Sequence, residues 1–213
     1  MEPFYIQEFD ITDNTVDCFG RLKPSMILYF AQEVAGRHFD RLAMTYDQLA
    51  AKGMFWAIIR QKVQITRLPR SGETVRIETW PMPATRVAYP RATVAYDAEG
   101  KELFRCIALW ILMDLNTRAM VVPGKSGIDF PGCTQGGELP SPKSLTPKDL
   151  PDAETRTVRF GQLDRNGHMN NTKYLEWVMD LLPGEFHREH PLKEFTVCYL
   201  NEAREGDRIT LRH

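Results

Sequence analysis

The sequence lacks the features that would place it in a membrane, in a secreted compartment or on nucleic acid. Its most apolar run, residues 106–113, has the length of a strand, whereas a membrane-spanning helix needs about 20 apolar residues. The first residues contain neither the basic region nor the apolar stretch of a signal peptide. A net charge of −1 gives no general excess of cations for binding nucleic acid. We therefore expect a cytoplasmic protein that spans no membrane and binds no nucleic acid.

Cysteine is scarce as well. The four cysteines form no C-x-x-C pair and have no spacing typical of metal ligands; they are Cys18, Cys106, Cys133 and Cys198. Free thiols in a reducing compartment are the simplest interpretation. The sequence accordingly predicts no metal site and no dissociable cofactor.

The first half of the chain carries a clear helical pattern. Of the 213 residues, 43% are hydrophobic, which is enough for one large domain or two small ones. A long helix is predicted to start near Met26, with Ser25 as its N-cap. Its apolar stripe consists of Ile27, Phe30, Ala31, Val34, Ala35 and His38. We interpret His38 as a packed histidine, because it continues this stripe. A shorter helix over residues 46–51 is expected to end at Gly53.

Strand patterns surround these helices. Residues 4–17 are predicted to form the first strand. Four further strand-like segments follow and are separated by turn sequences: 55–68, 74–80, 87–96 and 103–114. Residues 1–122 are therefore predicted to form one α+β unit with a long helix and an antiparallel sheet.

The composition changes over residues 123–157, where Pro and Gly are frequent, and we predict an extended linker there. The first pattern then restarts with a strand, a polar loop, a helix near Thr172 and two more strands; these strands are at 156–160, 194–201 and 208–211. This second unit, residues 158–213, has too few strands to close a sheet without exposed edges. We expect it to be incomplete and the native protein to continue past His213.

The most informative stretch is residues 160–182, a polar loop followed by a helical pattern that Pro183-Gly184 is expected to end. Candidates for the N-cap of the helix are Asn170, Asn171 and Thr172. The loop brings a carboxylate, an amide and an imidazole to the helix N-terminus: Asp164, Asn166 and His168. Free N–H groups and the helix dipole at that point can stabilise an oxyanion. The alternative is a capping loop whose polar side chains only satisfy turn backbone.

The run from Asp164 to Trp177 closely resembles the active-site loop and helix start of the acyl-ACP thioesterases, with the pattern Asp-x-Asn-x-His-x-Asn-Asn-x-x-Tyr-x-x-Trp. Segments 55–60, 72–80 and 108–118 are similar to strands of the same family, so the resemblance covers nearly the whole chain. It implies two tandem hotdog domains, each a long helix wrapped by an antiparallel sheet. It also implies hydrolysis of fatty acyl-[acyl carrier protein], which releases free fatty acid and ends chain elongation.

The resemblance implies the catalytic residues. In that family, catalysis is assigned to an Asp, an Asn and a His of the loop and to a Glu on a later strand. These roles transfer to Asp164, Asn166, His168 and Glu202. Plant members have a Cys after this Glu, whereas this chain has Ala203, which removes a thiol nucleophile at that place. The equivalent loop of the first unit, residues 17–24, contains no His or Asn, so one active site is expected.

Two assignments of roles follow from these residue types. In the first, Glu202 is the general base for water, and Asp164 orients His168 or Asn166. In the second, His168 is the base and Glu202 orients it; the sequence leaves both open. The thioester oxygen is expected to contact Asn166 and the backbone N–H groups of Met169, Asn170 and Asn171.

The resemblance also implies an acyl tunnel and a docking surface. The tunnel is expected along the helix and sheet of the first unit, at Met26, Phe30, Val34, Met54 and Trp56. Acyl carrier protein is acidic, so a basic surface is implied. Candidate cations, each equally compatible with a solvated strand face, are Arg60, Lys62, Arg67, Arg70, Arg86, Arg91, Arg165 and Lys173.

Rival functions stay open at this point. A hotdog thioesterase acting on acyl-CoA, including aromatic acyl-CoA, shares the loop but needs no tandem unit. A hotdog dehydratase or hydratase is a weaker alternative, because the Asp-x-Asn-x-His loop and Glu202 together suit the attack of water on a carbonyl. A non-catalytic double hotdog that only binds acyl chains belongs to another class, and the intact catalytic set argues against it. Chain-length preference and a homodimer are not decided by the sequence.

Overall fold

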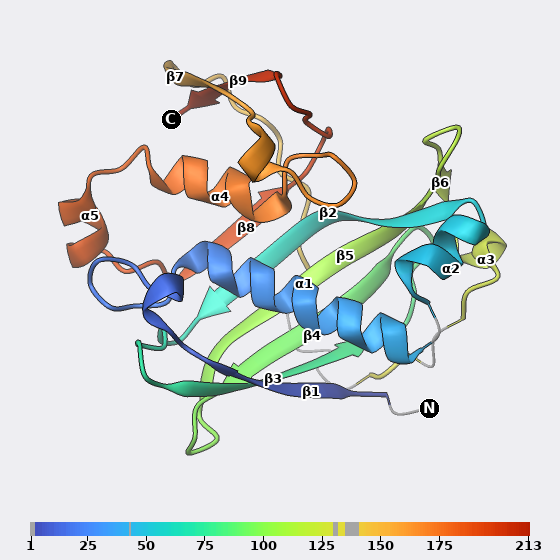
Figure 1. Ribbon diagram of the computed structural model, residues 1–213, viewed down its shortest axis with the longest axis horizontal. Coiled ribbons are helices and arrows are strands. Elements are labelled where there is room, and N and C mark those ends of the chain that lie inside the picture. Colours follow the sequence, from blue (N-terminus) through green and yellow to red (C-terminus); the bar gives the residue numbers. More distant parts are fainter. Residues whose placement is uncertain (1–2, 43, 130–131, 135–140) are drawn as a thin grey trace.

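The computed structural model describes residues 3–42, 44–129, 132–134 and 141–213. Its larger part is a seven-stranded antiparallel sheet accompanied by one long helix (Figure 1). The strands are β1 (Tyr5–Asp10), β2 (Met54–Ile65), β3 (Thr74–Pro81), β4 (Tyr89–Tyr96), β5 (Glu102–Asp114), β6 (Met120–Val121) and β8 (Glu194–Cys198). Their order is β1-β3-β4-β5-β2-β8, and β6 pairs with the end of β5. The predicted α+β class is confirmed.

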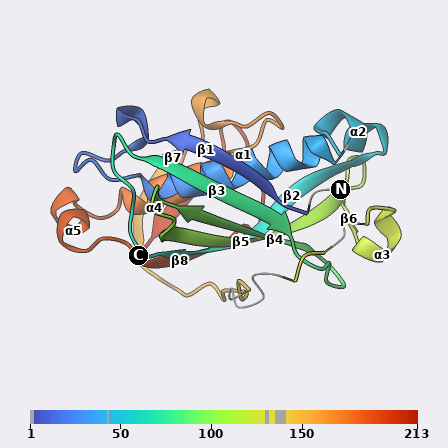
Figure 2. The same cartoon turned by 90° about the horizontal axis from the view of Figure 1, so that it is seen from below.

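Helix α1 (Pro24–Arg41) lies across one face of this sheet (Figure 2). Every member of the predicted apolar stripe is buried, and His38 is only 2% exposed. The predicted N-cap is wrong. Lys23 is the N-cap and Pro24 occupies the first helical position, where a residue without an N–H loses nothing, so Ser25 lies inside the first turn and is buried.

A short helix and a tight turn lead from α1 into the sheet. Helix α2 (Tyr46–Ala51) begins with a capping box, in which Thr45 accepts the N–H of Gln48 and the Gln48 side chain accepts the N–H of Thr45. The predicted stop is confirmed, because Gly53 has a φ of 72°. Strand β2 starts immediately afterwards, at Met54.

The predicted linker contains two regular elements. Helix α3 (Pro123–Ser126) forms a single turn, and β7 (Asp152–Thr157) begins four residues before the predicted strand at 156–160. Between these two elements, the described residues contain no helix or strand. The Pro and Gly content therefore predicted the irregular segment but not its C-terminal boundary, since β7 is defined by pairing with a distant strand.

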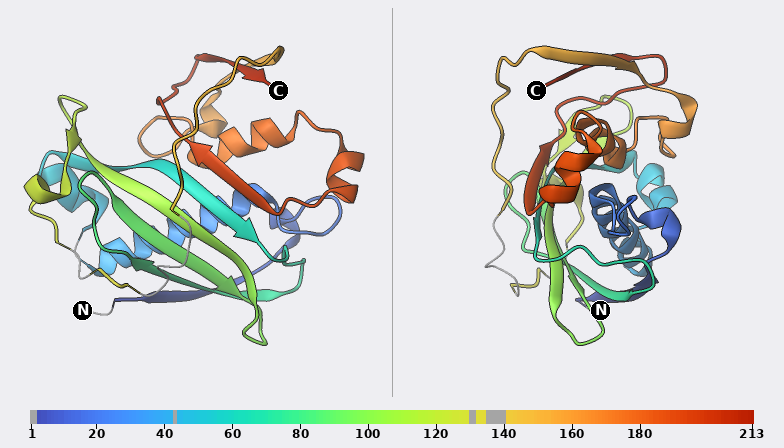
Figure 3. Two further views of the ribbon diagram at one scale, coloured as in Figure 1. Left: turned by 180° about the vertical axis from the view of Figure 1, so that it is seen from behind. Right: turned by 90° about the vertical axis from the view of Figure 1, so that its left-hand side faces the viewer.

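The C-terminal part is built on α4 (Asn171–Met179), α5 (Gly184–Glu189) and the pair β7–β9, with β9 at Arg208–Arg212. Figure 3 shows this pair at one end of the molecule, away from the large sheet. Asn170 is confirmed as the N-cap of α4, because its Oδ1 accepts the Thr172 N–H at 2.9 Å. Pro183-Gly184 starts α5 rather than ending α4, which stops at Met179.

Strand β8 joins the two parts of the chain into one sheet. It pairs with Arg60–Gln64 of β2, and one further bond runs from the Tyr199 N–H to the Ile59 carbonyl at 2.9 Å. In the described part of the chain, the first residues of β2 therefore have β5 on one side and no β8 residue on the other. This edge faces the predicted catalytic loop. Within the described residues, no helix has the length and apolar character needed to cross a bilayer.

Candidate active site

The loop before α4 is folded around the carboxylate of Asp164. Its Oδ1 accepts the backbone N–H groups of Asn166 at 2.8 Å and of His168 at 3.2 Å. The Asp164 N–H donates in turn to the His168 carbonyl at 2.7 Å. Gly167 has a φ of 73°, which lies in the left-handed region that favours glycine. Asp164 thus positions Asn166 and His168 through their backbone N–H groups. In a catalytic triad, this carboxylate would instead contact the imidazole ring.

His168 and Glu202 form the chemical centre of the site, with Nε2 3.3 Å from Oε2. A short backbone ladder brings them together: the Met169 N–H donates to the Ala203 carbonyl at 2.7 Å, and His168 pairs with Arg204. The His168 side chain is 11% exposed, whereas that of Glu202 is 40% exposed. A buried imidazole beside a carboxylate that water can reach is suited to moving protons.

The backbone donors differ from the prediction. The Met169 N–H is bonded to Ala203, and the Asn170 N–H donates to the Gln162 carbonyl at 2.8 Å. Neither is available to a thioester oxygen. Asn171 is the first residue of α4, where no intrahelical carbonyl can accept its N–H. Of the three predicted backbone donors, the geometry therefore favours Asn171.

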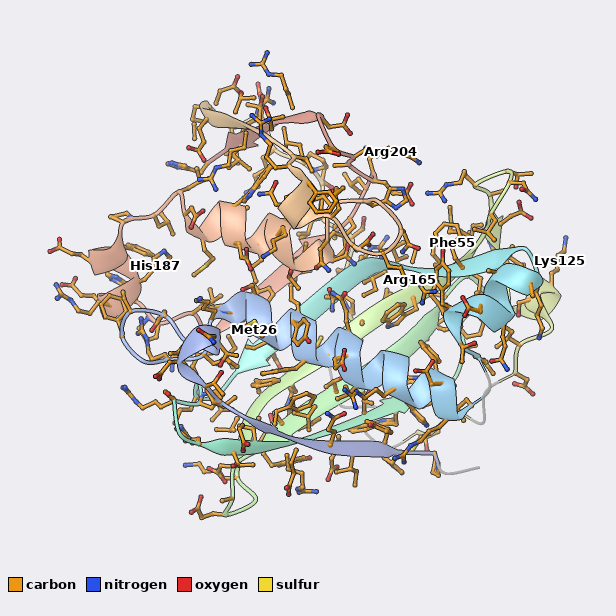
Figure 4. All side chains as sticks on the ribbon, in the orientation of Figure 1. Met26, Phe55, Lys125, Arg165, His187 and Arg204 are labelled. Atoms are coloured by element: carbon orange, nitrogen blue, oxygen red, sulfur yellow. The ribbon has the colours of Figure 1, made fainter. Side chains whose placement is uncertain are left out.

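All four predicted catalytic residues line one cavity of about 410 Å³. Most of its other polar residues come from the C-terminal part and include Asn171, Tyr174, Tyr199 and Asn201. Its apolar wall comes from the N-terminal sheet: Phe55, Trp56, Ile58, Trp110, Ile111 and Met113. Figure 4 shows Phe55 on β2 on the same side of the molecule as Arg165 of the loop. The site therefore forms where the two parts of the chain meet.

Five polar side chains of this cavity were not predicted as site residues: Tyr174, Tyr199 and Asn201 from the C-terminal part, and Gln32 of α1 and Arg118 of the turn between β5 and β6 from the N-terminal part. The Nε2 of Gln32 is buried and has no hydrogen-bond partner among the described residues. The guanidinium of Arg118 forms an ion pair with Glu202 and lies 4.6 Å from the Phe55 ring centroid. Residues 108–118 carried the family resemblance, but one sequence holds no signal for an ion pair between residues 84 positions apart.

The predicted acyl-binding residues divide into two groups. Met169, Asn171 and Trp56 line the cavity. The residues outside its wall are Met26, Phe30, Val34, Met54 and Asn170. Phe30 and Val34 are buried because the apolar stripe of α1 packs on the sheet, and Met54 is buried in a second core cluster with Leu49 and Tyr89. Figure 4 shows Met26 near the N-terminal end of α1, away from Phe55.

The predicted docking cations include one that no partner can reach. Arg91 is 2% exposed, so assigning it to a docking surface was wrong. Its guanidinium bonds to His38 and Thr79 and lies over the Phe39 ring, and burial lowers its pKa to about 9. The run of cations in the sequence gave no sign that this strand is covered on both faces, as the burial of every residue from Tyr89 to Ala95 shows.

Among the described residues, no group of three or more His, Cys, Asp and Glu could hold a metal ion. Burial raises the pKa of Cys106 to about 12, so this thiol stays protonated. Cys198 is the last residue of β8, and its Sγ donates to the Lys143 carbonyl at 3.8 Å.

The first unit contains a loop with the same hydrogen bonds. Asp17 Oδ1 accepts the N–H groups of Phe19 at 2.9 Å and Arg21 at 3.0 Å, and the Asp17 N–H donates to the Arg21 carbonyl at 2.7 Å. Gly20 has a φ of 71°. The Leu22 N–H donates to the Pro69 carbonyl at 2.8 Å. The two loops are thus equivalent in their backbones, residue for residue.

This second loop lacks the chemistry of the first. The residues at the positions of Asn166, His168 and Glu202 are Phe19, Arg21 and Leu68. A larger cavity of about 1060 Å³ lies beside it. Residue types, rather than cavity size, therefore favour the His168 loop as the active site.

Two tyrosines complete the cavity wall. Burial raises the pKa of Tyr174 and, more strongly, that of Tyr199, so both phenols stay protonated at neutral pH. The Tyr199 hydroxyl lies 3.1 Å from Gln61 Oε1 and 3.2 Å from the Asn171 carbonyl, and it serves as a donor to these acceptors. Tyr199 thereby connects β2 with the first residue of α4.

Comparisons with known proteins agree across the whole chain. The family model described as the acyl-ACP thioesterase N-terminal domain matches residues 2–123, and that of the C-terminal domain matches residues 147–213. The oleoyl-acyl carrier protein thioesterase 2, chloroplastic, of Arabidopsis thaliana is 24% identical over 229 residues, covering 97% of this chain. The chain spans 60% of that relative's length.

Two solved structures have the same fold. One is an acyl-ACP thioesterase from Bacteroides thetaiotaomicron, with a TM-score of 0.86 and 23% identity over 98% of this chain and 85% of that one. The other is a putative oleoyl thioesterase from Lactobacillus plantarum, with a TM-score of 0.82 and 27% identity over 97% of this chain and 82% of that one.

Proposed function

The chain belongs to the acyl-ACP thioesterase family, and we propose that it hydrolyses the thioester between a fatty acyl chain and the phosphopantetheine arm of acyl carrier protein. The observation that carries this proposal is the pairing of His168 with Glu202 in a cavity that has one polar and one apolar wall. The relatives' names supply the substrate class. The apolar wall provides a place for the acyl group, and the polar wall surrounds the thioester.

Glu202 is the general base in this proposal. One carboxylate oxygen, Oε2, is held by both His168 and Arg118, which leaves the other oxygen to accept a proton from water. The water oxygen then bonds to the thioester carbon, and the carbon–sulfur bond breaks. The proton taken by Glu202 goes to the departing sulfur. The products are a free fatty acid and the phosphopantetheine thiol.

Three hydrogen-bond donors line the part of the cavity that we assign to the thioester oxygen. The Asn171 N–H lies at the positive end of α4, where an oxyanion is stabilised. The Asn166 side chain and the unpaired Nε2 of Gln32 line the same cavity. Because Gln32 belongs to α1 and Asn171 to α4, both parts of the chain contribute to oxyanion binding.

The acidic carrier protein docks beside the catalytic loop. Arg165 is exposed there, pairs with Asp47 at 3.1 Å and lies 4.2 Å from the Tyr46 ring centroid. Figure 4 shows Arg165 and Arg204 on the same side of the molecule. An exposed ion pair of this kind is weak and exchanges readily for a charged partner. Docking through such cations predicts that kcat/KM falls steeply with salt.

The function is tested by the release of free fatty acid from matched panels of acyl-ACP and acyl-CoA. We expect acyl-ACP to be preferred, with one chain-length optimum. A preference for acyl-CoA would move the protein to the acyl-CoA thioesterases with the site unchanged. Binding without release on both panels would contradict hydrolysis and leave a protein that only binds acyl chains.

The same assay tests the roles of the two central residues. Loss of a general base or of its partner typically lowers turnover by about 10²–10⁴-fold, and we expect Glu202→Gln and His168→Ala to fall in this range. Arg21→Ala, at the position equivalent to His168 in the first unit, is the matched control and should leave turnover unchanged. Near-normal turnover in either test variant would remove that residue from the mechanism.

A further inference from the structure

The turn between β5 and β6 holds an arginine in an unusual backbone conformation. Among the described residues, Arg118 is the one residue other than glycine with a positive φ, at 57°. This left-handed conformation is unfavourable for a residue with a side chain and persists where the surrounding structure imposes it. Such residues are concentrated at functional sites, so the turn calls for a functional explanation.

The surrounding turn imposes this conformation through Asp114. Its Oδ1 accepts the N–H groups of Asn116 at 2.9 Å and Thr117 at 2.7 Å, together with the Thr117 hydroxyl at 3.0 Å. The Arg118 N–H donates to the Asp114 carbonyl at 3.1 Å. These bonds fix the backbone on the N-terminal side of Arg118 and therefore the direction in which its side chain leaves the turn.

The Arg118 side chain crosses from the N-terminal part of the chain to the carboxylate of Glu202. Its guanidinium packs on the Phe55 ring at 4.6 Å and reaches the same oxygen, Oε2, that faces His168 Nε2. The side chains of Arg118 and Glu202 are 37% and 40% exposed, so as a surface ion pair they contribute little to stability. The strained backbone is therefore not explained by stability.

We propose that Arg118 is a positioning residue that holds Glu202 against His168 and thereby couples the N-terminal unit to the reaction. This inference rests on the proposed function, in which Glu202 activates water. With Oε2 held from two sides, the carboxylate cannot rotate away from the cavity, and its second oxygen stays directed to water. Without Arg118, Glu202 keeps only the contact with His168 and samples orientations in which water is not activated.

The test uses substitutions that suit the backbone of the turn. Asn tolerates the left-handed region, so Arg118→Asn removes the guanidinium without adding strain. We expect kcat with acyl-ACP to fall about 10- to 100-fold, KM to stay within about twofold, and the melting temperature not to decrease. Arg118→Lys keeps the charge and should restore part of kcat. Arg212→Asn, which removes an exposed ion pair with Asp152, is the matched control and should leave kcat unchanged.

A double-mutant cycle shows whether Arg118 acts through Glu202. We expect Arg118→Asn to have no further effect on kcat in a Glu202→Gln protein, because the positioned base is already lost. An equal loss in both backgrounds would overturn the inference. A rise in KM with unchanged kcat would also overturn it, since Arg118 would then bind the carrier rather than position the base.

The contact can also be followed without turnover. Arg118→Asn is expected to shift the ring resonances of His168 in the wild-type background and to leave them unchanged in the Glu202→Gln protein. Unshifted resonances in the wild-type background would overturn the contact. If the wild-type protein is inactive but Arg118→Asn still shifts the His168 resonances, only the proposed function is contradicted. If the wild-type protein is active and Arg118→Asn is equally active, only the positioning role is contradicted.

Discussion

Three aspartates in this chain have the same local task. Asp17, Asp114 and Asp164 each use one carboxylate oxygen to accept two backbone N–H groups from the turn that follows. A short side chain that bonds to its own turn fixes that turn without help from the rest of the fold. Two of the turns place residues of the candidate site, Arg118 and His168. At the scale of single residues, the site thus depends on carboxylates that need not touch the substrate.

The pKa of Asp114 gives a test of this role. Bonds from the backbone and hydroxyl of Thr117, then from the Asn116 N–H, lower this pKa below its ordinary value of 3.8. Because the pKa of Asp114 is lower in the folded protein, the ionised carboxylate stabilises the fold at pH values above 3.8. This stabilisation is lost as the pH falls through the folded-state pKa. We expect Asp114→Asn to lower the urea midpoint at neutral pH, and the difference from wild type to shrink as the pH falls below 3.8.

Asn116→Ala provides the control for that titration. It lies in the same turn but carries no titratable group, so any shift in its midpoint should not depend on pH. A difference for Asp114→Asn that persists unchanged in strong acid would show that the carboxylate charge does not stabilise the turn.

At the scale of elements, the chain repeats one device: a loop around an aspartate, a left-handed glycine and a helix. Capping residues and apolar spacing, which are local signals, predicted the helix and the polar loop, whereas the family resemblance implied the catalytic candidates. The sequence pattern indicated residues 17–24 as the equivalent loop but did not predict that the hydrogen bonds of the two loops match one for one, because Phe19 and Arg21 share no chemistry with Asn166 and His168. The residues that set the backbone are the same in both loops, Asp17 with Asp164 and Gly20 with Gly167, while the residues between them differ.

The two loops allow a matched pair of substitutions. Gly167→Ala and Gly20→Ala each place a side chain at a φ near 70° with open space around it, so each should destabilise the fold by about 1–2 kcal/mol. Only Gly167→Ala should also lower kcat, by about tenfold or more, because it shifts the adjacent His168. Urea unfolding and acyl-ACP turnover measure the two effects separately.

Gly161→Ala serves as the control for both, since Gly161 has open space around it and no left-handed φ. It should change neither stability nor turnover appreciably. An equal loss of kcat in Gly20→Ala and Gly167→Ala would mean that turnover follows overall stability rather than the geometry of one loop.

At the scale of the whole molecule, the site depends on contacts between residues far apart in sequence. Strand β8 extends the N-terminal sheet, Arg118 reaches Glu202, and Tyr199 connects Gln61 with Asn171. None of these contacts could be predicted from one sequence, since each joins residues separated by tens of positions and leaves no periodic pattern. For the same reason, the apolar stripe of α1 predicted buried residues correctly but not which of them line the cavity.

Tyr199→Phe tests how tightly the two parts are joined. The substitution keeps the ring but leaves the Gln61 Oε1 and the Asn171 carbonyl without their donor, which should cost about 1–3 kcal/mol at neutral pH. Burial raises the pKa of Tyr199 in the folded state, so its stabilising effect is complete below the ordinary value of 10.0 and is lost as the pH rises further. The free-energy difference between wild type and Tyr199→Phe should therefore narrow in alkali.

Tyr29→Phe, on the exposed side of α1, is the control, and its free energy of unfolding should match that of wild type at every pH. Urea unfolding across this pH range measures this difference, and a Tyr199→Phe protein as stable as wild type at neutral pH would show that the Tyr199 hydroxyl does not help to hold the two parts together.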